Sequence, residues 1–255
     1  MKTSANDASL RAAGIKRNQM KNVPLVAVVF ALALAGLAAQ PAVAEEGVAL
    51  AIVYDTSGSM KDPVRDQNGK MTPKYVIANR ALVEIAKQVQ AFATNSSSGA
   101  PRKIEAGVFV FDKNSAREAV KFGPFDEVAI ENFANSFSGP SGNTPLGNSL
   151  TVASRAVFRS PLTHKHILVI TDGMNTAGPK PEEVLPKLKE QALQKGSALS
   201  THFVAFDVDA KVFAPVKKLD ATVVAAADEK QLDTQLQFIL QRKILLEEEE
   251  TPKKP

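Results

Sequence analysis

The stretch Val48-Ala-Leu-Ala-Ile-Val-Tyr54, followed directly by Asp55-Thr-Ser-Gly-Ser59, decides the fold of this chain. An apolar run without a charge is typical of a strand buried on both faces, in a parallel sheet covered by helices. Oxygen-bearing side chains then follow at alternate positions, at Asp55, Ser57 and Ser59. Ligand sites of open α/β sheets form beyond the carboxyl ends of the strands. The stretch therefore predicts both a fold class and the place of a site.

Strand and helix patterns alternate along the rest of the chain. After a polar loop over 61–72, Thr72-Pro73 is expected to cap and begin a helix. Further strands are predicted over 104–111, 116–122, 166–170, 199–206 and 221–225, and helices over 73–93, 125–137, 146–157, 181–195, 212–219 and 232–244. This alternation predicts a Rossmann-like, doubly wound α/β domain. Its six-stranded sheet is expected to be mostly parallel, with segment 116–122 as an antiparallel edge strand and helices on both faces.

The distribution of charge argues against a nucleic-acid-binding protein. The net charge is +4, but residues 1–44 hold five of the 31 basic and one of the 27 acidic residues, which leaves 26 of each elsewhere. A nucleic-acid binder is expected to keep a basic stripe in its folded part. The chain has no cysteine, so disulfides and thiolate chemistry are excluded.

The first 44 residues have the pattern of a signal peptide. Basic residues precede the apolar run Val23–Ala39, and Pro41-Ala-Val-Ala44 offers small residues for cleavage. A periplasmic location is therefore predicted for the mature protein. The alternative is an uncleaved leader that anchors the protein in the inner membrane, facing the periplasm; only in that case is a membrane a partner. The charged residues 247–255 are expected to form a disordered tail.

Two other segments place oxygen ligands where the first site is expected. Asp172-Gly173 follows the predicted strand 166–170, and Thr144 lies in a loop that opens a helix. In the strand order 3-2-1-4-5-6, the first and fourth strands are neighbours. This order would bring Asp55 and Asp172 together.

These segments resemble the metal-ion-dependent adhesion site of the von Willebrand factor type A domain. Asp55-Thr-Ser-Gly-Ser59, Thr144 and Asp172-Gly173 carry the resemblance, which extends over residues 45–246 and suggests an exported bacterial member. It implies Mg²⁺ held by the hydroxyls of Ser57, Ser59 and Thr144, with Asp55 and Asp172 acting largely through waters and hydrogen bonds. It also implies a binding module rather than an enzyme, which grips an Asp or Glu of a partner protein. Mn²⁺ and Ca²⁺ are alternative ions, since they also accept oxygen ligands.

Other interpretations of the sequence stay open or are set aside. A Mg²⁺-dependent hydrolase using Asp55 is the enzymatic alternative, although no general base or lysine is evident beside the cluster. An accessory subunit for metal insertion or complex assembly with an ATPase is a third function. The segment Gly142–Ser149 nearly matches a P-loop but has Asn148 in place of lysine. His164 and His166 are expected to be a surface feature at a strand end.

Overall fold

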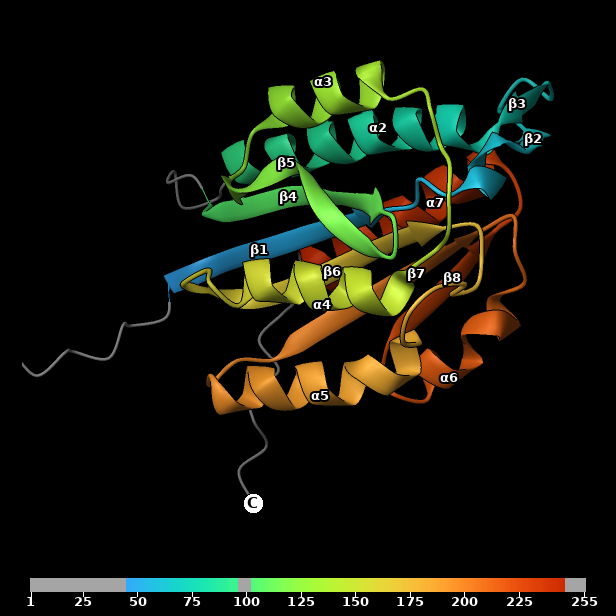
Figure 1. The fold of residues 1–255 in the computed structure, drawn as a ribbon. Helices are drawn as coiled ribbons and strands as arrows, with labels where there is room; N and C mark the ends of the chain where they lie inside the picture. Colours follow the sequence, from blue (N-terminus) through green and yellow to red (C-terminus); the bar gives the residue numbers. More distant parts are fainter. Residues whose placement is uncertain (1–44, 96–101, 246–255) are drawn as a thin grey trace, which may run out of the picture. The chain divides into compact units, whose positions relative to one another are not determined.

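The computed structural model describes residues 45–95 and 102–245 (Figure 1). All of them belong to one compact unit. The predicted signal peptide, most of the loop predicted over 95–99 and the predicted tail lie outside the described residues. Among the helices of the described part, none is long and apolar enough to cross a membrane.

A six-stranded sheet with β1 (Glu45–Tyr54) near its centre forms the middle layer (Figure 1). The other strands are β4 (Ile104–Asp112), β5 (Ser115–Pro124), β6 (Leu162–Thr171), β7 (Leu199–Phe206) and β8 (Thr222–Ala226). Their order is β5-β4-β1-β6-β7-β8, and every neighbouring pair is parallel except β4 and β5. Numbered along the main sheet, this is the order 3-2-1-4-5-6, the one that would bring Asp55 and Asp172 together, and the predicted antiparallel edge strand is confirmed.

Helices cover both faces of the sheet, as predicted. One apolar core is shared with α2 (Lys74–Thr94), α3 (Glu127–Ser136), α7 (Glu229–Ile239) and the π-helical turn η3 (Leu240–Ile244). The other is shared with α4 (Leu146–Val157), α5 (Pro181–Gln194), η2 (Ala210–Phe213) and α6 (Ala214–Lys217). Alternate residues of β1 belong to the two cores, with Ile52 in the first and Val53 in the second. The apolar run is continuous because both of its faces are buried.

The segment expected to be a polar loop is more ordered than predicted. It forms the 3-10 turn η1 (Gly58–Lys61) and a small hairpin of β2 (Pro63–Arg65) and β3 (Met71–Pro73). The expectation that Thr72 caps α2 is wrong, because Thr72 pairs with Val64 in the hairpin. Its hydroxyl donates instead to Asp66 Oδ2 at 2.9 Å. Helix α2 begins at Lys74, directly after the hairpin.

His166 is also placed differently from the prediction. Strand β6 begins at Leu162, so His166 lies inside it and is completely buried. Its ring stacks on that of His202 in β7, with 5.5 Å between centroids and 3.2 Å between Nδ1 of His166 and Nε2 of His202. Burial lowers the pKa of both imidazoles, that of His202 to about 4. The pair is a neutral part of the core rather than a surface feature.

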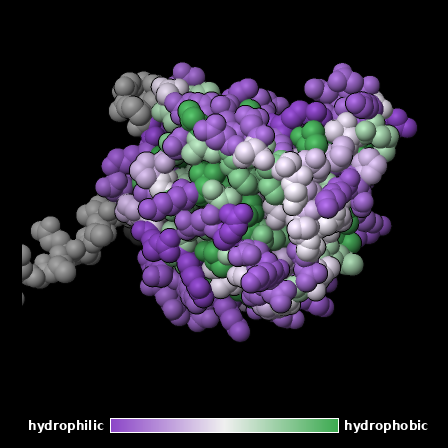
Figure 2. Space-filling view, turned by 45° about the horizontal axis from the view of Figure 1, so that its top comes forward, coloured by the Kyte–Doolittle hydropathy of each residue, from purple (hydrophilic) through white to green (hydrophobic). Residues whose placement is uncertain are grey.

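On the face shown in Figure 2, hydrophilic residues surround a smaller hydrophobic area. The large hydrophobic side chains that are exposed in the described part are Met71, Val128, Met174, Leu193 and Phe238. Met71 belongs to the hairpin that precedes Lys74, and Met174 follows Asp172-Gly173.

Candidate metal-binding site

The predicted site residues lie at the carboxyl ends of β1 and β6. These strands are parallel neighbours with Tyr54 opposite Ile170, so Asp55 and Asp172 emerge at the same edge of the sheet. The loop that carries Thr144 is tied to the same edge by two backbone hydrogen bonds. Gly58 N donates to Gly142 O at 3.1 Å, and Ser141 N donates to Thr56 O at 2.7 Å. The loop before α4 is thereby held against the loop after β1.

The spacing of the oxygen atoms fits a small octahedral cation. Ser57 Oγ and Ser59 Oγ are 3.1 Å apart, and Ser59 Oγ donates to Asp172 Oδ1 at 2.8 Å. Neighbouring oxygens around an ion with bonds of about 2.0–2.1 Å are about 2.9 Å apart, so these separations match edges of an octahedron. Thr144 Oγ1 lies 3.9 Å from the position that a Cβ on Gly173 would take. Its hydroxyl therefore faces the turn after Asp172.

Asp55 is a buried carboxylate that holds the loop after β1 in place. It is completely buried, and its Oδ1 accepts a hydrogen bond from Ser57 N at 2.7 Å. Its Oδ2 accepts one from Thr171 Oγ1 at 2.5 Å. Burial raises the pKa of Asp55 to about 6, although the hydrogen bonds from Ser57 and Thr171 lower it and the charge of Asp172 raises it further. With both oxygens held, Asp55 fixes the turn that presents Ser57.

Thr144 is held in place by its backbone. Its N–H donates to Thr176 Oγ1 at 2.8 Å, and Thr176 N–H donates back to Thr144 O at 3.0 Å. This reciprocal pair joins the loop before α4 to the loop after β6. The threonine hydroxyl is left to face the site, and only 4% of the residue is exposed.

Two charged residues of the site were not predicted from the sequence. Lys74 is only 5% exposed, and its Nζ lies 2.8 Å from Asp172 Oδ2 and 3.3 Å from Asp207 Oδ2. Burial alone would lower the pKa of Lys74, but the hydrogen bonds and charges of Asp172 and Asp207 raise it above its ordinary value. The expectation that no lysine lies beside the cluster is wrong. Asp207 directly follows β7. The search for carboxylates just after predicted strands, which found Asp55 and Asp172, would therefore also have found Asp207.

A hollow of about 410 Å³ adjoins the site. Leu146 and Met174 line it, and each is two residues from a proposed site residue, Thr144 or Asp172. Two residues span at most about 7 Å, so the hollow is lined by close chain neighbours of the site residues. Its wall is largely apolar and includes Phe213 of η2 and Val216 of α6, with the charged Lys180 and Glu182 at the start of α5.

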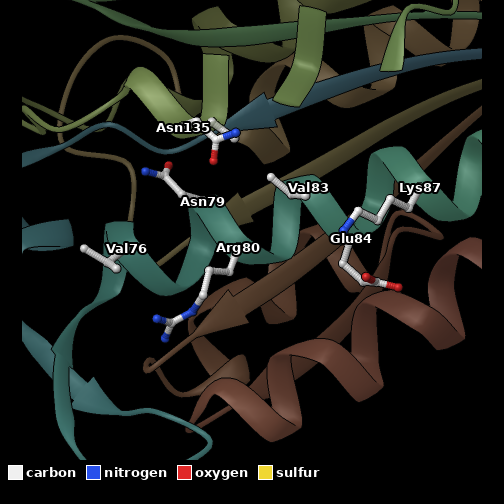
Figure 3. A pocket seen from close by; sticks show the side chains of 8 residues that line it. Val76, Asn79, Arg80, Val83, Glu84, Lys87 and Asn135 are labelled. Carbon is white, nitrogen blue, oxygen red and sulfur yellow. The ribbon is translucent and has the colours of Figure 1, made fainter. Parts of the chain in front are cut away.

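A second hollow, of about 430 Å³, lies between α2 and α3 (Figure 3). Asn79 and Asn135 point toward each other across it, while Arg80 points away from Asn135. Arg80 Nε and Nη2 contact the carboxylate of Glu229 at 2.7 and 2.9 Å. Within residues 45–95 and 102–245, no group of three or more histidines and carboxylates is arranged to hold a metal ion.

Comparison with known proteins agrees with the fold. The family model of the von Willebrand factor type A domain matches residues 50–175. No curated protein matches the sequence.

Several solved structures are similar to this chain. The vWF domain of the type V pili tip protein Mfa5 from Porphyromonas gingivalis has a TM-score of 0.57 at 12% identity, over 77% of this chain and 95% of that one. The PilB minor pilin from Streptococcus sanguinis has a TM-score of 0.56 at 15% identity, over 76% of this chain and 61% of the pilin. Proximal thread matrix protein 1 from the mussel byssus, with a zinc-occupied MIDAS motif, has a TM-score of 0.54 at 16% identity, over 77% of this chain and 48% of the mussel protein. The chain thus spans about half to three fifths of the latter two proteins, and at these identities the likeness concerns the fold.

Proposed function

Because this chain contains a von Willebrand factor type A domain, we propose that it is an exported, metal-dependent protein-binding module. The proposed site holds Mg²⁺ with the hydroxyls of Ser57, Ser59 and Thr144, supported by Asp55 and Asp172. Its ligand is an Asp or Glu side chain of a partner protein. The observation that carries this proposal is the spacing of 3.1 Å between the serine hydroxyls and 2.8 Å between Ser59 and Asp172, which suits an octahedral ion.

The chemistry of the residues favours an anionic partner. When bound, the ion supplies an electrophilic position for a carboxylate oxygen. Hydroxyl ligands carry no charge, so the groups proposed to contact the ion directly do not themselves neutralise it. Ser59 is exposed, whereas Ser57 and Thr144 are buried, so the site opens to solvent on the side of Ser59. Small hydroxyl ligands favour Mg²⁺; Mn²⁺ and Ca²⁺ remain alternatives.

The hydrolase alternative has less support from the geometry. Asp55 is completely buried and both of its oxygens accept hydrogen bonds, so it is poorly placed to attack a substrate. Lys74 is engaged by two carboxylates rather than directed at an open position. The third function, an accessory subunit that works with an ATPase, requires a cytoplasmic protein. It is less compatible with a cleaved leader and export to the periplasm.

Metal binding is tested first, with the full chain and calorimetric titration of Mg²⁺. Ser59→Ala removes one proposed ligand, and Ser141→Ala is the control, because Ser141 is an exposed serine of the adjoining loop. We expect Ser59→Ala to weaken Mg²⁺ binding at least tenfold and Ser141→Ala to leave it unchanged. Equal affinities for both variants and the wild type would contradict the assignment of Ser59.

Partner binding is tested by affinity capture from the native cell envelope, with Mg²⁺ or with a chelator. The expected result is a partner retained with Mg²⁺, lost with the chelator and lost with Asp55→Ala. Capture that neither treatment changes would remove the proposed function. Mg²⁺-dependent turnover of phosphate or ester substrates would instead support the hydrolase.

A further inference from the structure

The ammonium group of Lys74 is enclosed within the candidate site. Lys74 is the first residue of α2 and is 5% exposed. A buried charge is costly unless it is paired, and here Asp172 and Asp207 pair it from the ends of two neighbouring strands, β6 and β7. A fixed positive charge therefore stands beside the proposed cation.

Asp172 is shared between this ammonium and the proposed metal ligands. Its Oδ2 lies 2.8 Å from Lys74 Nζ, while its Oδ1 accepts the hydrogen bond from Ser59 Oγ at 2.8 Å. The ammonium of Lys74 contacts one oxygen of the Asp172 carboxylate. A cation held by the serine hydroxyls would lie on the side of the other oxygen. Because both are positive, each weakens the binding of the other.

The charge balance of the site depends on Lys74. Asp55, Asp172 and Asp207 supply three negative charges when ionised, and Lys74 supplies one positive charge. A divalent ion brings the sum to zero, whereas without Lys74 the loaded site would remain negative. An incoming carboxylate would then meet net repulsion.

We propose that Lys74 is a built-in counter-ion that weakens cation binding and strengthens the binding of a carboxylate to the cation-loaded site. This inference rests on the proposed function. It predicts that removal of the charge moves the two affinities in opposite directions. A lysine that only fastened α2 to the sheet would, when removed, weaken both.

Helix α2 has other attachments beside Lys74. Tyr54 Oη donates to Tyr75 O at 3.1 Å and to Asn79 Oδ1 at 2.7 Å. Asn79 Nδ2 donates in turn to Phe137 O at 2.8 Å. These contacts hold the first turns of α2 against β1 and the end of α3, so we expect the helix to stay in place without the ammonium.

The test compares Lys74→Met with Lys70→Met in the full chain. Each substitution removes one positive charge, at Lys74 in the first position of α2 or at Lys70 in the adjacent hairpin. Because Lys70 is exposed, Lys70→Met controls for the change in net charge. Mn²⁺ is the cation probe, measured by the electron paramagnetic resonance of the free ion. Acetate is the carboxylate probe, measured by the loss of water-proton relaxation when it displaces water from the Mn²⁺-loaded protein.

Lys74→Met is expected to bind Mn²⁺ roughly tenfold tighter and acetate roughly tenfold weaker, since a neighbouring charge changes such equilibria by a factor of about ten or more. Lys70→Met is expected to change neither affinity by more than about twofold, as is usual for a screened surface charge. Lys74→Arg keeps the charge and should retain acetate binding. Asp207→Asn should shift both affinities in the reverse sense, and this variant keeps the proposal testable if Lys74→Met does not fold.

The outcomes separate this inference from the proposed function. If the wild type binds Mn²⁺ but Lys74→Met weakens both affinities or leaves both unchanged, the role of Lys74 is refuted and the metal site stands. If Lys74→Met does not fold, Asp207→Asn takes its place. The role of Lys74 is then refuted if Asp207→Asn does not weaken Mn²⁺ binding and strengthen acetate binding. If the wild type binds no divalent cation, both proposals fail.

Discussion

Thr171, the last residue of β6, donates its hydroxyl to Asp55, the first residue after β1, at 2.5 Å. The bond joins the two central strands at the edge where the site lies. It also satisfies one oxygen of a carboxylate that is completely buried.

Replacement of Thr171 by valine keeps the shape of the side chain but leaves Asp55 Oδ2 without this donor. We expect the free energy of unfolding to fall by about 1–3 kcal/mol, the usual cost of an unsatisfied buried acceptor. Thr201→Val is the matched control, because Thr201 is buried in β7 and its hydroxyl has no hydrogen-bond partner among the described residues. Urea unfolding in the absence of metal measures the free energy of unfolding of both variants. A loss of stability in Thr201→Val as large as that in Thr171→Val would refute the explanation.

The buried pair of His166 and His202 predicts a loss of stability in acid. The pKa of His202 is lowered to about 4 in the folded protein, mainly by burial and also by the charge of Lys243. The unfolded chain, with a histidine pKa of about 6.5, binds the proton more readily. The contribution of His202 to the free energy of unfolding is therefore fully present above about pH 6.5. It is lost as the pH falls toward 4, by about 3 kcal/mol in total.

Asp55 titrates in the opposite sense over part of the same range. Its pKa is raised to about 6 in the folded state, so its protonation favours the folded protein as the pH falls. The histidine effect is therefore measured as a difference between the wild type and His202→Leu at pH 7 and pH 4.5. The variant should lose less stability than the wild type on acidification. Equal losses would show that His202 does not titrate with a lowered pKa.

Glu229 fastens the β2–β3 hairpin to the body of the domain. Its carboxylate is buried, contacts Arg80 Nε at 2.7 Å and accepts a hydrogen bond from Gln67 N in the hairpin turn at 2.8 Å. Glu229→Ala removes both contacts and leaves the guanidinium without its partner. We expect faster hydrogen exchange in residues 65–70 and a loss of about 2–3 kcal/mol of stability. Glu84→Ala, at an exposed glutamate of α2, should change neither quantity; unchanged exchange in Glu229→Ala would count against this anchor.

Gly147 allows α4 to approach the loop after β6. A Cβ there would lie 2.2 Å from Pro179 O, so alanine must push the backbone of that loop away. Because the same loop holds Thr144 through Thr176, Gly147→Ala should lower the melting temperature and weaken Mg²⁺ binding. Gly139→Ala is the control, since a Cβ at Gly139 has no atom within 4 Å. A Gly147→Ala protein with the stability and Mg²⁺ affinity of the wild type would exclude the proposed close approach.

Much of the fold could be predicted because the strands are long and apolar. The continuous apolar runs of β1 and β6 made these strands recognisable. The sequence does not give the strand order, and 3-2-1-4-5-6 was only one order that the alternation of strands and helices allowed. The positions of Asp55 and Asp172 at one edge followed from that order. The family resemblance supplied the place of Thr144, which its loop alone would not have shown.

Other features depend on contacts that leave little trace in the sequence. Strands β2 and β3 are three residues each, too short for a recognisable alternation of apolar and polar residues. Lys74 contacts Asp172, which lies 98 residues further along the chain, and no motif in the sequence indicates that contact. His166 was expected at a strand end because β6 was predicted to begin four residues late.

The central position of β1 has a consequence for the synthesis of the chain. Its pairing with β4 involves residues 104–110, whereas its other edge is covered only by β6, from residue 162 onward. A nascent chain that has not reached β6 therefore presents an apolar strand with an open edge. Such edges promote pairing between chains. The strand that organises the finished domain is thus exposed to pairing with other chains while translation is incomplete.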